Sequence, residues 1–210
     1  HVALAQLPEF TEGLCQPQDS TAQRAMLLAA PSPGEFDLDL CAGAGTKATH
    51  AAELMGNAGL VIACDPDIDR LARLDANAAR LGTTIVKKTT PADLDTEIAR
   101  AGRLPDLIVL DVPCTNTGAL ARRPEARYRA SHKSLLALAA VQREILNNAL
   151  RLAGPATRML YSTCSIEREE NEDQMEWFIG QHEGWRISEQ KLTLPDDRRD
   201  GGFAALLRQT

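Results

Sequence analysis

The sequence predicts an α/β fold in which most strands of the sheet run parallel. From residue 36 onward, short apolar runs typical of strands alternate with longer helical stretches, which is the pattern of repeated βαβ units. Glycine-containing turn signals separate these stretches. A chain of 210 residues with 44% hydrophobic side chains is large enough for the core of one such domain. We therefore expect a single α/β domain.

Seven runs are predicted as strands. They are residues 36–41, 60–65, 84–88, 106–111, 157–163, 185–189 and 202–208. Five helices are expected at 46–55, 67–81, 91–101, 133–152 and 168–181, with joins marked by Asn57, Gly59, Gly82, Gly102 and Gly154-Pro155. No adequate crossover helix separates the last two strands, so the final strand is expected to pair antiparallel with its neighbour. The result is a mostly parallel seven-stranded sheet with one antiparallel strand.

The first 35 residues differ in character from the rest of the chain. They are rich in Pro and Gln, and we expect residues 1–35 to form a helix-containing lead-in that packs on the main domain, residues 36–210. Because the chain begins with His1 and not with Met, we treat it as a segment that can belong to a longer protein.

The charge balance argues against a surface that binds nucleic acid everywhere. The formal net charge is −6, which is the wrong sign for such a protein. Basic residues nevertheless gather around Tyr128. They are Arg122, Arg123, Arg127, Arg129, His132 and Lys133. This cluster is either a local phosphate-binding patch or a solvated face of a flexible loop.

The cysteines indicate a reducing compartment. There are five, an odd number, and none belongs to a Cys-x-x-Cys pair, which argues against a disulfide framework and a zinc ribbon. We therefore expect no metal. No apolar run approaches the roughly 20 residues that span a bilayer, and nothing at the start resembles a signal peptide. We expect a soluble, cytoplasmic protein without a membrane partner, and a monomer by default.

A glycine-bearing turn follows the first predicted strand. It consists of Cys41, Ala42, Gly43, Ala44, Gly45, Thr46 and Lys47. The glycines let backbone approach a ligand closely, and amides at the start of the next helix can meet a negative group. A Walker loop is excluded because the spacing is too short and Ala48 follows the lysine where Ser or Thr is required. A tight turn without any ligand remains an alternative.

An acidic residue ends the second predicted strand. Asp65 lies about 20 residues after the glycine turn, where a carboxylate can accept both hydroxyls of a ribose. Alternatively, Asp65 caps the following helix, although Asp67 or Asp69 can serve equally well. Because nicotinamide dinucleotide enzymes share both features, the reaction must be decided by other residues.

Two cysteines close two further apolar runs. Cys114 follows Asp111, Val112 and Pro113 at the end of one run, and Cys164 ends the other. Ligands bind beyond the carboxyl ends of parallel strands, so both thiols can face one pocket. A lone cysteine at a strand end is usually a small buried hydrophobe. Two in equivalent positions, one behind an Asp-x-Pro, point instead to a reaction centre.

These segments resemble the RNA 5-methylcytosine methyltransferases of the Sun/NOP2 family over nearly the whole chain. The resemblance rests on Leu7–Phe10 with Gln18-Asp19, Asp39–Lys47, Asp111–Thr115 with Thr117-Gly118, Arg122–Glu125, Thr163–Ser165 with Glu170-Asn171, and Asp200–Phe203. The Thr-Cys-Ser segment is the most diagnostic. Two segments differ from the family's usual pattern. The loop lacks the usual Ala-Pro-Gly-Gly-Lys, and Thr89-Thr90 stands where the family usually carries Gly-Asp.

The resemblance implies the Rossmann-like fold of class I S-adenosylmethionine-dependent methyltransferases. It implies methyl transfer to carbon 5 of cytosine in rRNA or tRNA through a covalent cysteine adduct. Cys164 is then the nucleophile, Cys114 assists product release, and Asp111 contacts both base and cofactor. The loop 41–47, Asp65, Thr90 and Asp111 are expected to bind S-adenosylmethionine. The RNA phosphates are expected to meet Arg122, Arg123 and Arg127.

Two alternatives stay open. The roles of the two cysteines can be exchanged, since the Pro-Cys dipeptide carries the nucleophile in DNA cytosine methyltransferases. The chain can also be a catalytically silent methyltransferase-like module that binds RNA or supports assembly. The altered loop and Thr90 support that second alternative, whereas the two thiols and Asp111 oppose it. A dinucleotide oxidoreductase leaves both cysteine motifs unexplained.

Overall fold

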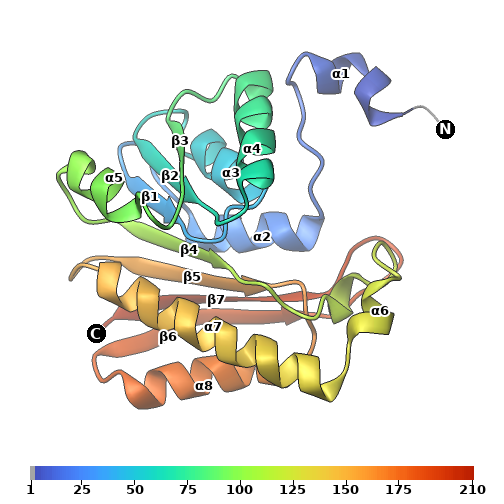
Figure 1. Ribbon diagram of the computed structural model, residues 1–210, viewed down its shortest axis with the longest axis vertical. Helices are drawn as coiled ribbons and strands as arrows, with labels where there is room; N and C mark the ends of the chain where they lie inside the picture. Colours follow the sequence, from blue (N-terminus) through green and yellow to red (C-terminus); the bar gives the residue numbers. More distant parts are fainter. Residues whose placement is uncertain (1–2) are drawn as a thin grey trace.

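The computed structural model describes residues 3–210 and shows a central sheet with helices packed on both faces (Figure 1). Within these residues the sheet has seven strands in the order β3-β2-β1-β4-β5-β7-β6. They are β1 (Phe36–Asp39), β2 (Leu60–Cys64), β3 (Val86–Thr89), β4 (Leu107–Asp111), β5 (Arg158–Thr163), β6 (Trp185–Thr193) and β7 (Gly202–Gln209). Neighbouring strands pair in parallel except for β7, which runs antiparallel to β5 and β6. The predicted α/β sheet with one antiparallel strand is confirmed.

The described residues form the helices α1 (Pro8–Thr11), α2 (Ser20–Ala29), α3 (Thr46–Leu54), α4 (Ile68–Leu81), α5 (Leu94–Ala101), α6 (Ala126–Arg129), α7 (His132–Leu152) and α8 (Glu172–Gln181). The longer ones cover the two faces of the sheet. On one face α2, α3 and α4 bury Met26 and Leu74 against the inner strands, and on the other α7 and α8 cover Phe36 and Ile108. Successive strand residues point to opposite faces, so β2 and β4, which are covered on both sides, are almost entirely apolar, whereas the central strand β1 also buries Asp37 and Asp39.

Three predicted elements differ from the structure by three residues or more at one end. The helix predicted at 168–181 is a 3₁₀ turn followed by α8, because Asn171 leaves helical geometry with φ −122° and ψ −99°. The helix predicted from residue 91 begins at Leu94, after a turn closed by the Asp93 amide on the Thr90 carbonyl at 3.1 Å. The strand predicted at 185–189 continues to Thr193 past a bulge, since β7 pairs with it along its length.

The segment before β1 reaches the sheet through α2. Asp19 caps this helix by accepting the Thr21 amide at 2.8 Å, and the helix packs on β5 and β7. Residues 1 and 2 of the predicted lead-in lie outside the described residues, and a division at residue 35 stays a prediction. Between residues 3 and 210, no helix is long and apolar enough to cross a membrane.

Candidate active site

The two cysteine segments meet at the carboxyl ends of β4 and β5. These strands are parallel neighbours, so the loops that leave them emerge at the same edge of the sheet. The Sγ atoms of Cys114 and Cys164 lie 3.2 Å apart, and both thiols are reduced. The Cys164 thiol also donates to Asn116 Oδ1 at 2.9 Å, while the Asn116 amide group donates to the Cys114 carbonyl at 2.8 Å. Asn116 therefore links the two loops.

The electrostatic environment separates the two thiols. A hydrogen bond from Cys114 lowers the pKa of Cys164, with help from the positive charges of Lys47 and Arg123 and despite burial. The same hydrogen bond and burial raise the pKa of Cys114 well above its ordinary value. These opposite directions favour the thiolate at Cys164 over the thiolate at Cys114.

An ion pair stands beside the thiols. Lys47 Nζ lies 2.7 Å from Asp111 Oδ2, and Ser162 Oγ donates to Asp111 Oδ1 at 2.9 Å. Burial opposes the charge of Lys47, but its contact with Asp111 raises the pKa of the lysine overall. The glycine loop supplies Lys47, and β4 and β5 supply its partners, so three strand ends converge here.

A buried polar network behind the cysteines holds the loops in place. Glu170 is fully buried and accepts the Thr115 amide at 2.9 Å and the Thr115 hydroxyl at 2.6 Å. Gln142 donates to the same carboxylate at 3.2 Å, and Tyr161 donates to the Glu170 carbonyl at 2.6 Å. The sequence motif containing Glu170 suggested no role for it, and nothing in the sequence singles out Gln142 or Tyr161.

The predicted cofactor loop is arranged around Asp65. Its Oδ2 accepts the Gly43 amide and its Oδ1 accepts the Asp67 amide, each at 2.8 Å. Asp67 accepts the first amides of α4, so Asp67 and not Asp65 caps that helix. Gly45 is left-handed at φ 82°, and a Cβ there would lie 2.5 Å from Leu74, whereas a Cβ at Gly43 would meet nothing within 4 Å. The loop thus packs through Gly45 and borders open space at Gly43.

The remaining loop residues, Cys41, Ala42, Ala44 and Thr46, lie in the same turn. Ala42 donates to the Cys64 carbonyl at 3.0 Å, Asn77 donates to the Ala44 carbonyl at 3.1 Å, and Thr46 begins α3. Burial raises the pKa of Cys41, so this thiol is no nucleophile.

Asp39 lies at the start of the glycine loop and is not among the site residues predicted from the sequence. Its Oδ1 accepts the Cys41 amide at 3.2 Å, but its buried Oδ2 has no partner among the described residues. Burial, with the charge of Asp111, raises the pKa of Asp39 to about 7. Its sequence signals are the pair of carboxylates in Asp-Leu-Asp-Leu and its place at the start of the segment Asp39–Lys47, which resembles the family. Thr90, after β3, donates to Asp93 Oδ2 at 3.0 Å.

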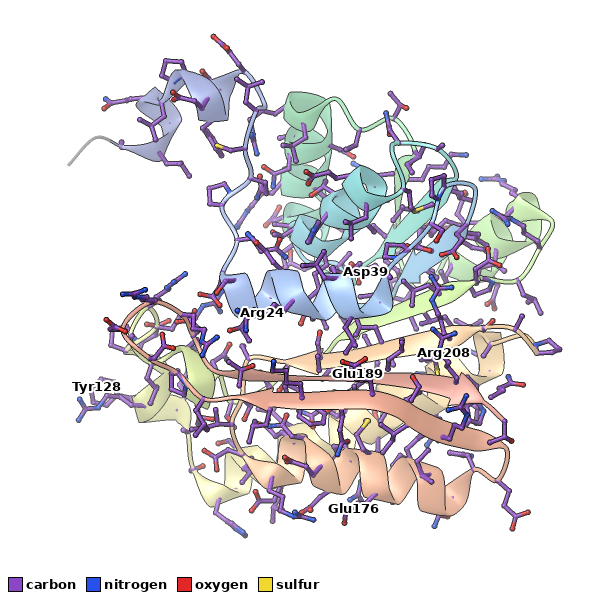
Figure 2. All side chains as sticks on the ribbon, turned by 180° about the vertical axis from the view of Figure 1, so that it is seen from behind. Arg24, Asp39, Tyr128, Glu176, Glu189 and Arg208 are labelled. Carbon is purple, nitrogen blue, oxygen red and sulfur yellow. The ribbon has the colours of Figure 1, made fainter. Side chains whose placement is uncertain are left out.

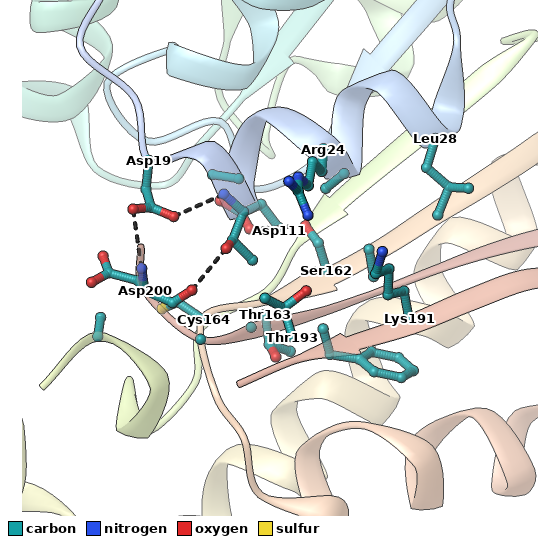
Figure 3. A pocket seen from close by; sticks show the side chains of 18 of the residues that line it. Asp19, Arg24, Leu28, Asp111, Ser162, Thr163, Cys164, Lys191, Thr193 and Asp200 are labelled. Atoms are coloured by element: carbon teal, nitrogen blue, oxygen red, sulfur yellow. Dashed lines mark hydrogen bonds between the residues drawn. The ribbon is translucent and has the colours of Figure 1, made fainter. Parts of the chain in front are cut away.

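A cavity of about 600 Å³ opens beside Cys164 (Figure 3). Lys47, Asp111 and Ser162 line it, whereas Cys114 does not. It continues from the cysteine loops along α2, β7 and β6.

The three predicted RNA-binding arginines lie in different surroundings. Arg123 lines the cavity. Arg122 instead forms ion pairs with Asp19 at 2.9 Å and Asp200 at 3.5 Å. Arg127 is exposed on α6 and lies over the Tyr128 ring at 5.1 Å. Within residues 3–210, no group of three or more His, Cys, Asp or Glu side chains is arranged to hold a metal ion.

Comparison with known proteins identifies the family. The family model described as 16S rRNA methyltransferase RsmB/F matches residues 25–206. The chain belongs to the RsmB/F methyltransferase family. A probable ribosomal RNA small subunit methyltransferase B of Synechocystis is 35% identical over 98% of this chain and 46% of its own length. The methyltransferase B of Erwinia tasmaniensis is 37% identical over 99% of this chain and 50% of its own. The chain thus spans about half the length of these relatives.

Solved structures agree with the RsmB/F assignment. The crystal structure of PH0851 superposes with a TM-score of 0.92 at 33% identity, covering all of this chain and 50% of that one. NSun6 from Pyrococcus horikoshii, determined with the S-adenosylmethionine analogue SFG, gives 0.87 at 28% identity and covers 56% of that chain. The predicted resemblance, Rossmann-like methyltransferase fold and S-adenosylmethionine dependence of the family are confirmed.

Proposed function

We propose that this RsmB/F chain transfers a methyl group from S-adenosylmethionine to carbon 5 of a cytosine in RNA, with Cys164 as the nucleophile. One observation carries the assignment of the nucleophile. Cys164 lines the cavity together with Lys47 and Asp111, whereas Cys114 contacts Cys164 but does not line the cavity. The named relatives favour small-subunit rRNA as the substrate.

The chemistry requires a thiolate at this position. Carbon 5 of cytosine is a poor nucleophile, and addition of a thiolate at carbon 6 converts it into an enamine-like one. The lowered pKa of Cys164 favours that thiolate at neutral pH. As sulfur adds, negative charge develops on ring nitrogen 3, and a group at that edge of the base must supply a proton. We assign this edge to Asp111, with the ammonium group of its partner Lys47 as the source of the shared proton. When bound, S-adenosylmethionine supplies an electrophilic methyl group.

Product release requires loss of the proton on carbon 5 and cleavage of the bond between sulfur and carbon 6. Cys114 is the titratable side chain in direct contact with Cys164, and its own proton is held tightly in the resting site. This contact supports a role for Cys114 in release. Cytosines that are unpaired or easily flipped are the expected substrates, because the base must leave any stack to reach the sulfur.

The loop residues fit S-adenosylmethionine. The space beside Gly43 admits a ligand close to backbone, and the unpartnered Oδ2 of Asp39 can accept from the ammonium group of the methionine part. We assign the methionine part to residues 41–47 and the ribose hydroxyls to Asp65. Thr90, with the Asp93 carboxylate that its hydroxyl contacts, is assigned to the adenine amino group.

Trapping with 5-fluorocytidine tests the nucleophile. Fluorine on carbon 5 cannot leave as a cation, so the protein stays bonded to the base after methyl transfer. With S-adenosylmethionine and a small-subunit rRNA transcript containing 5-fluorocytidine, the wild type and Cys114→Ala should form an adduct in a denaturing gel. Cys164→Ala should form none. Cys15→Ala, which alters an exposed cysteine outside the cavity, is the matched control.

Two outcomes contradict the proposal. An adduct with Cys164→Ala but none with Cys114→Ala would exchange the roles of the cysteines. RNA binding without any heat of S-adenosylmethionine binding in calorimetry would establish the silent RNA-binding module instead. With unmodified RNA, Cys114→Ala should accumulate the adduct because release is impaired.

A further inference from the structure

A groove runs from the thiols to the far edge of the sheet. Strand register places Asp111, Ser162, Ala204 and Lys191 in one row across β4, β5, β7 and β6. Directly paired residues point to the same face of a sheet, and all four line the cavity on the α2 side. Three strand spacings separate the ends, so the Lys191 backbone lies about 14 Å from that of Asp111.

The walls and floor of this groove have different characters. Small side chains at Ser162 and Ala204 form the floor, while α2 supplies Arg24, Leu27 and Leu28 on the opposite side. Figure 3 shows Arg24 and Leu28 pointing from α2 toward the sheet and Lys191 rising from β6 toward them. Glu189 lies below α2 on the same strand (Figure 2). The groove therefore offers apolar surface and two cations in one continuous space with Cys164.

The unpaired charges in the cavity are mainly positive. Lys47 forms an ion pair with Asp111, and Arg122, which does not itself line the cavity, forms ion pairs with both Asp19 and Asp200. Across residues 3–210, no ion pair within 4.0 Å involves the remaining lining charges, which are Arg24, Arg123, Lys191 and Glu189. The lining contains four cations and four anions in all. The charges left without an ion pair are three cations and one anion, and among them Arg24 and Lys191 can bind an anionic group such as a phosphate, although the whole chain is acidic.

We propose that this groove holds the nucleotide next to the target cytosine on the RNA strand. Arg24 and Lys191 bind its phosphate, and Leu28 packs against its base. The inference rests on the proposed function, because the groove is continuous with the cavity assigned to the target base. It commits to a single strand of RNA, whose unpaired bases present an apolar face to such a wall.

The test is removal of both cations with a matched control. Arg24→Gln with Lys191→Gln removes two charges inside the groove. Arg186→Gln with Arg208→Gln removes two exposed charges from a directly paired position of β6 and β7 that does not line the cavity. Methylation kinetics and filter binding of a small-subunit rRNA transcript over a salt series are measured for both, with calorimetry of S-adenosylmethionine.

The groove variant should raise the KM for RNA about tenfold and flatten the salt dependence of log K by about one. Its kcat and its affinity for S-adenosylmethionine should stay at the wild-type level, and the control variant should match the wild type throughout. If the two variants have the same RNA affinity and the same salt slope, the inference is wrong. A protein segment would then be the better candidate for the occupant of the groove. If the wild type binds RNA but makes no 5-methylcytosine, the proposed function fails, and the binding data still decide the groove.

Discussion

Substitution of Asp37 should change how the stability of the protein depends on pH. Asp37 lies on the central strand β1, is 1% exposed, and neither carboxyl oxygen has a hydrogen-bond partner among the described residues. Burial, followed by the charge of Glu35, raises its pKa from 3.8 to about 7, against the opposing charge of Arg158. The folded protein therefore keeps this carboxyl protonated at pH values where the unfolded chain has already released the proton.

The sign and size of the effect follow from linkage. Because the folded pKa lies above the unfolded one, the protonated Asp37 contributes stability that is fully present below pH 4. That contribution is lost as the pH rises from about 4 to 7, and above pH 7 the stability no longer changes through this group. The whole effect amounts to about 4 kcal/mol, of which roughly 2.5 kcal/mol falls between pH 5 and pH 8.

The assay compares Asp37→Asn with the wild type by urea unfolding at several pH values. Asn has the same shape and does not titrate, so the unfolding free energy of the variant relative to the wild type should increase by roughly 2.5 kcal/mol from pH 5 to pH 8. Asp197→Asn, at an exposed loop position, corrects for the loss of one acidic group. A difference between Asp37→Asn and the wild type that does not vary with pH would refute the reasoning.

Four further variants test the site. Lys47→Met removes a cation that lowers the pKa of Cys164, so alkylation of this thiol followed by peptide mass spectrometry should show a higher midpoint pH; an unchanged midpoint contradicts the assignment. Glu170→Gln replaces an acceptor oxygen of the buried network with an amide group that cannot accept from Thr115, and it should cost about 1–3 kcal/mol in urea unfolding. A variant as stable as the wild type would show the network to be dispensable. Gly45→Ala should lower the melting temperature more than Gly43→Ala, whereas Gly43→Ala should weaken S-adenosylmethionine binding in calorimetry; the reverse order would contradict the loop geometry.

The sequence predicts those parts of the site that local pattern and strand topology determine. Apolar runs locate the strands, and the rule that ligands bind at the carboxyl ends of parallel strands brings together Cys114 and Cys164 from 50 positions apart. The glycine turn and Asp65 follow from the same rule. These features depend on segments whose character is visible within a few residues.

Other parts of the site depend on partners that no local pattern reveals. Gln142 lies within a long helix and Tyr161 within a buried strand, and only packing shows that both reach Glu170. Asn171 interrupts the predicted helix because its side chain bonds the Ser165 carbonyl and the Thr163 hydroxyl across the loop. Such side-chain bonds compete with helix formation, and the sequence alone does not decide the outcome.

The ion pairs of the cavity also reconcile an acidic chain with the proposed RNA substrate. The basic cluster and the family resemblance predict that Arg122 binds phosphates, but its ion-pair partners, Asp19 and Asp200, lie 181 positions apart and no local pattern reveals them. Asp200 also donates its amide to Asp19 at 3.1 Å, so the three residues tie the start of α2 to the segment before β7 at the cavity wall. Asp19 and Asp200 thereby hold the cavity wall together through internal contacts. Arg24 and Lys191, which have no ion-pair partner among the described residues, can bind the proposed anionic ligand. The net charge of a chain is a poor guide to its ligand when most carboxylates at the site already have internal partners.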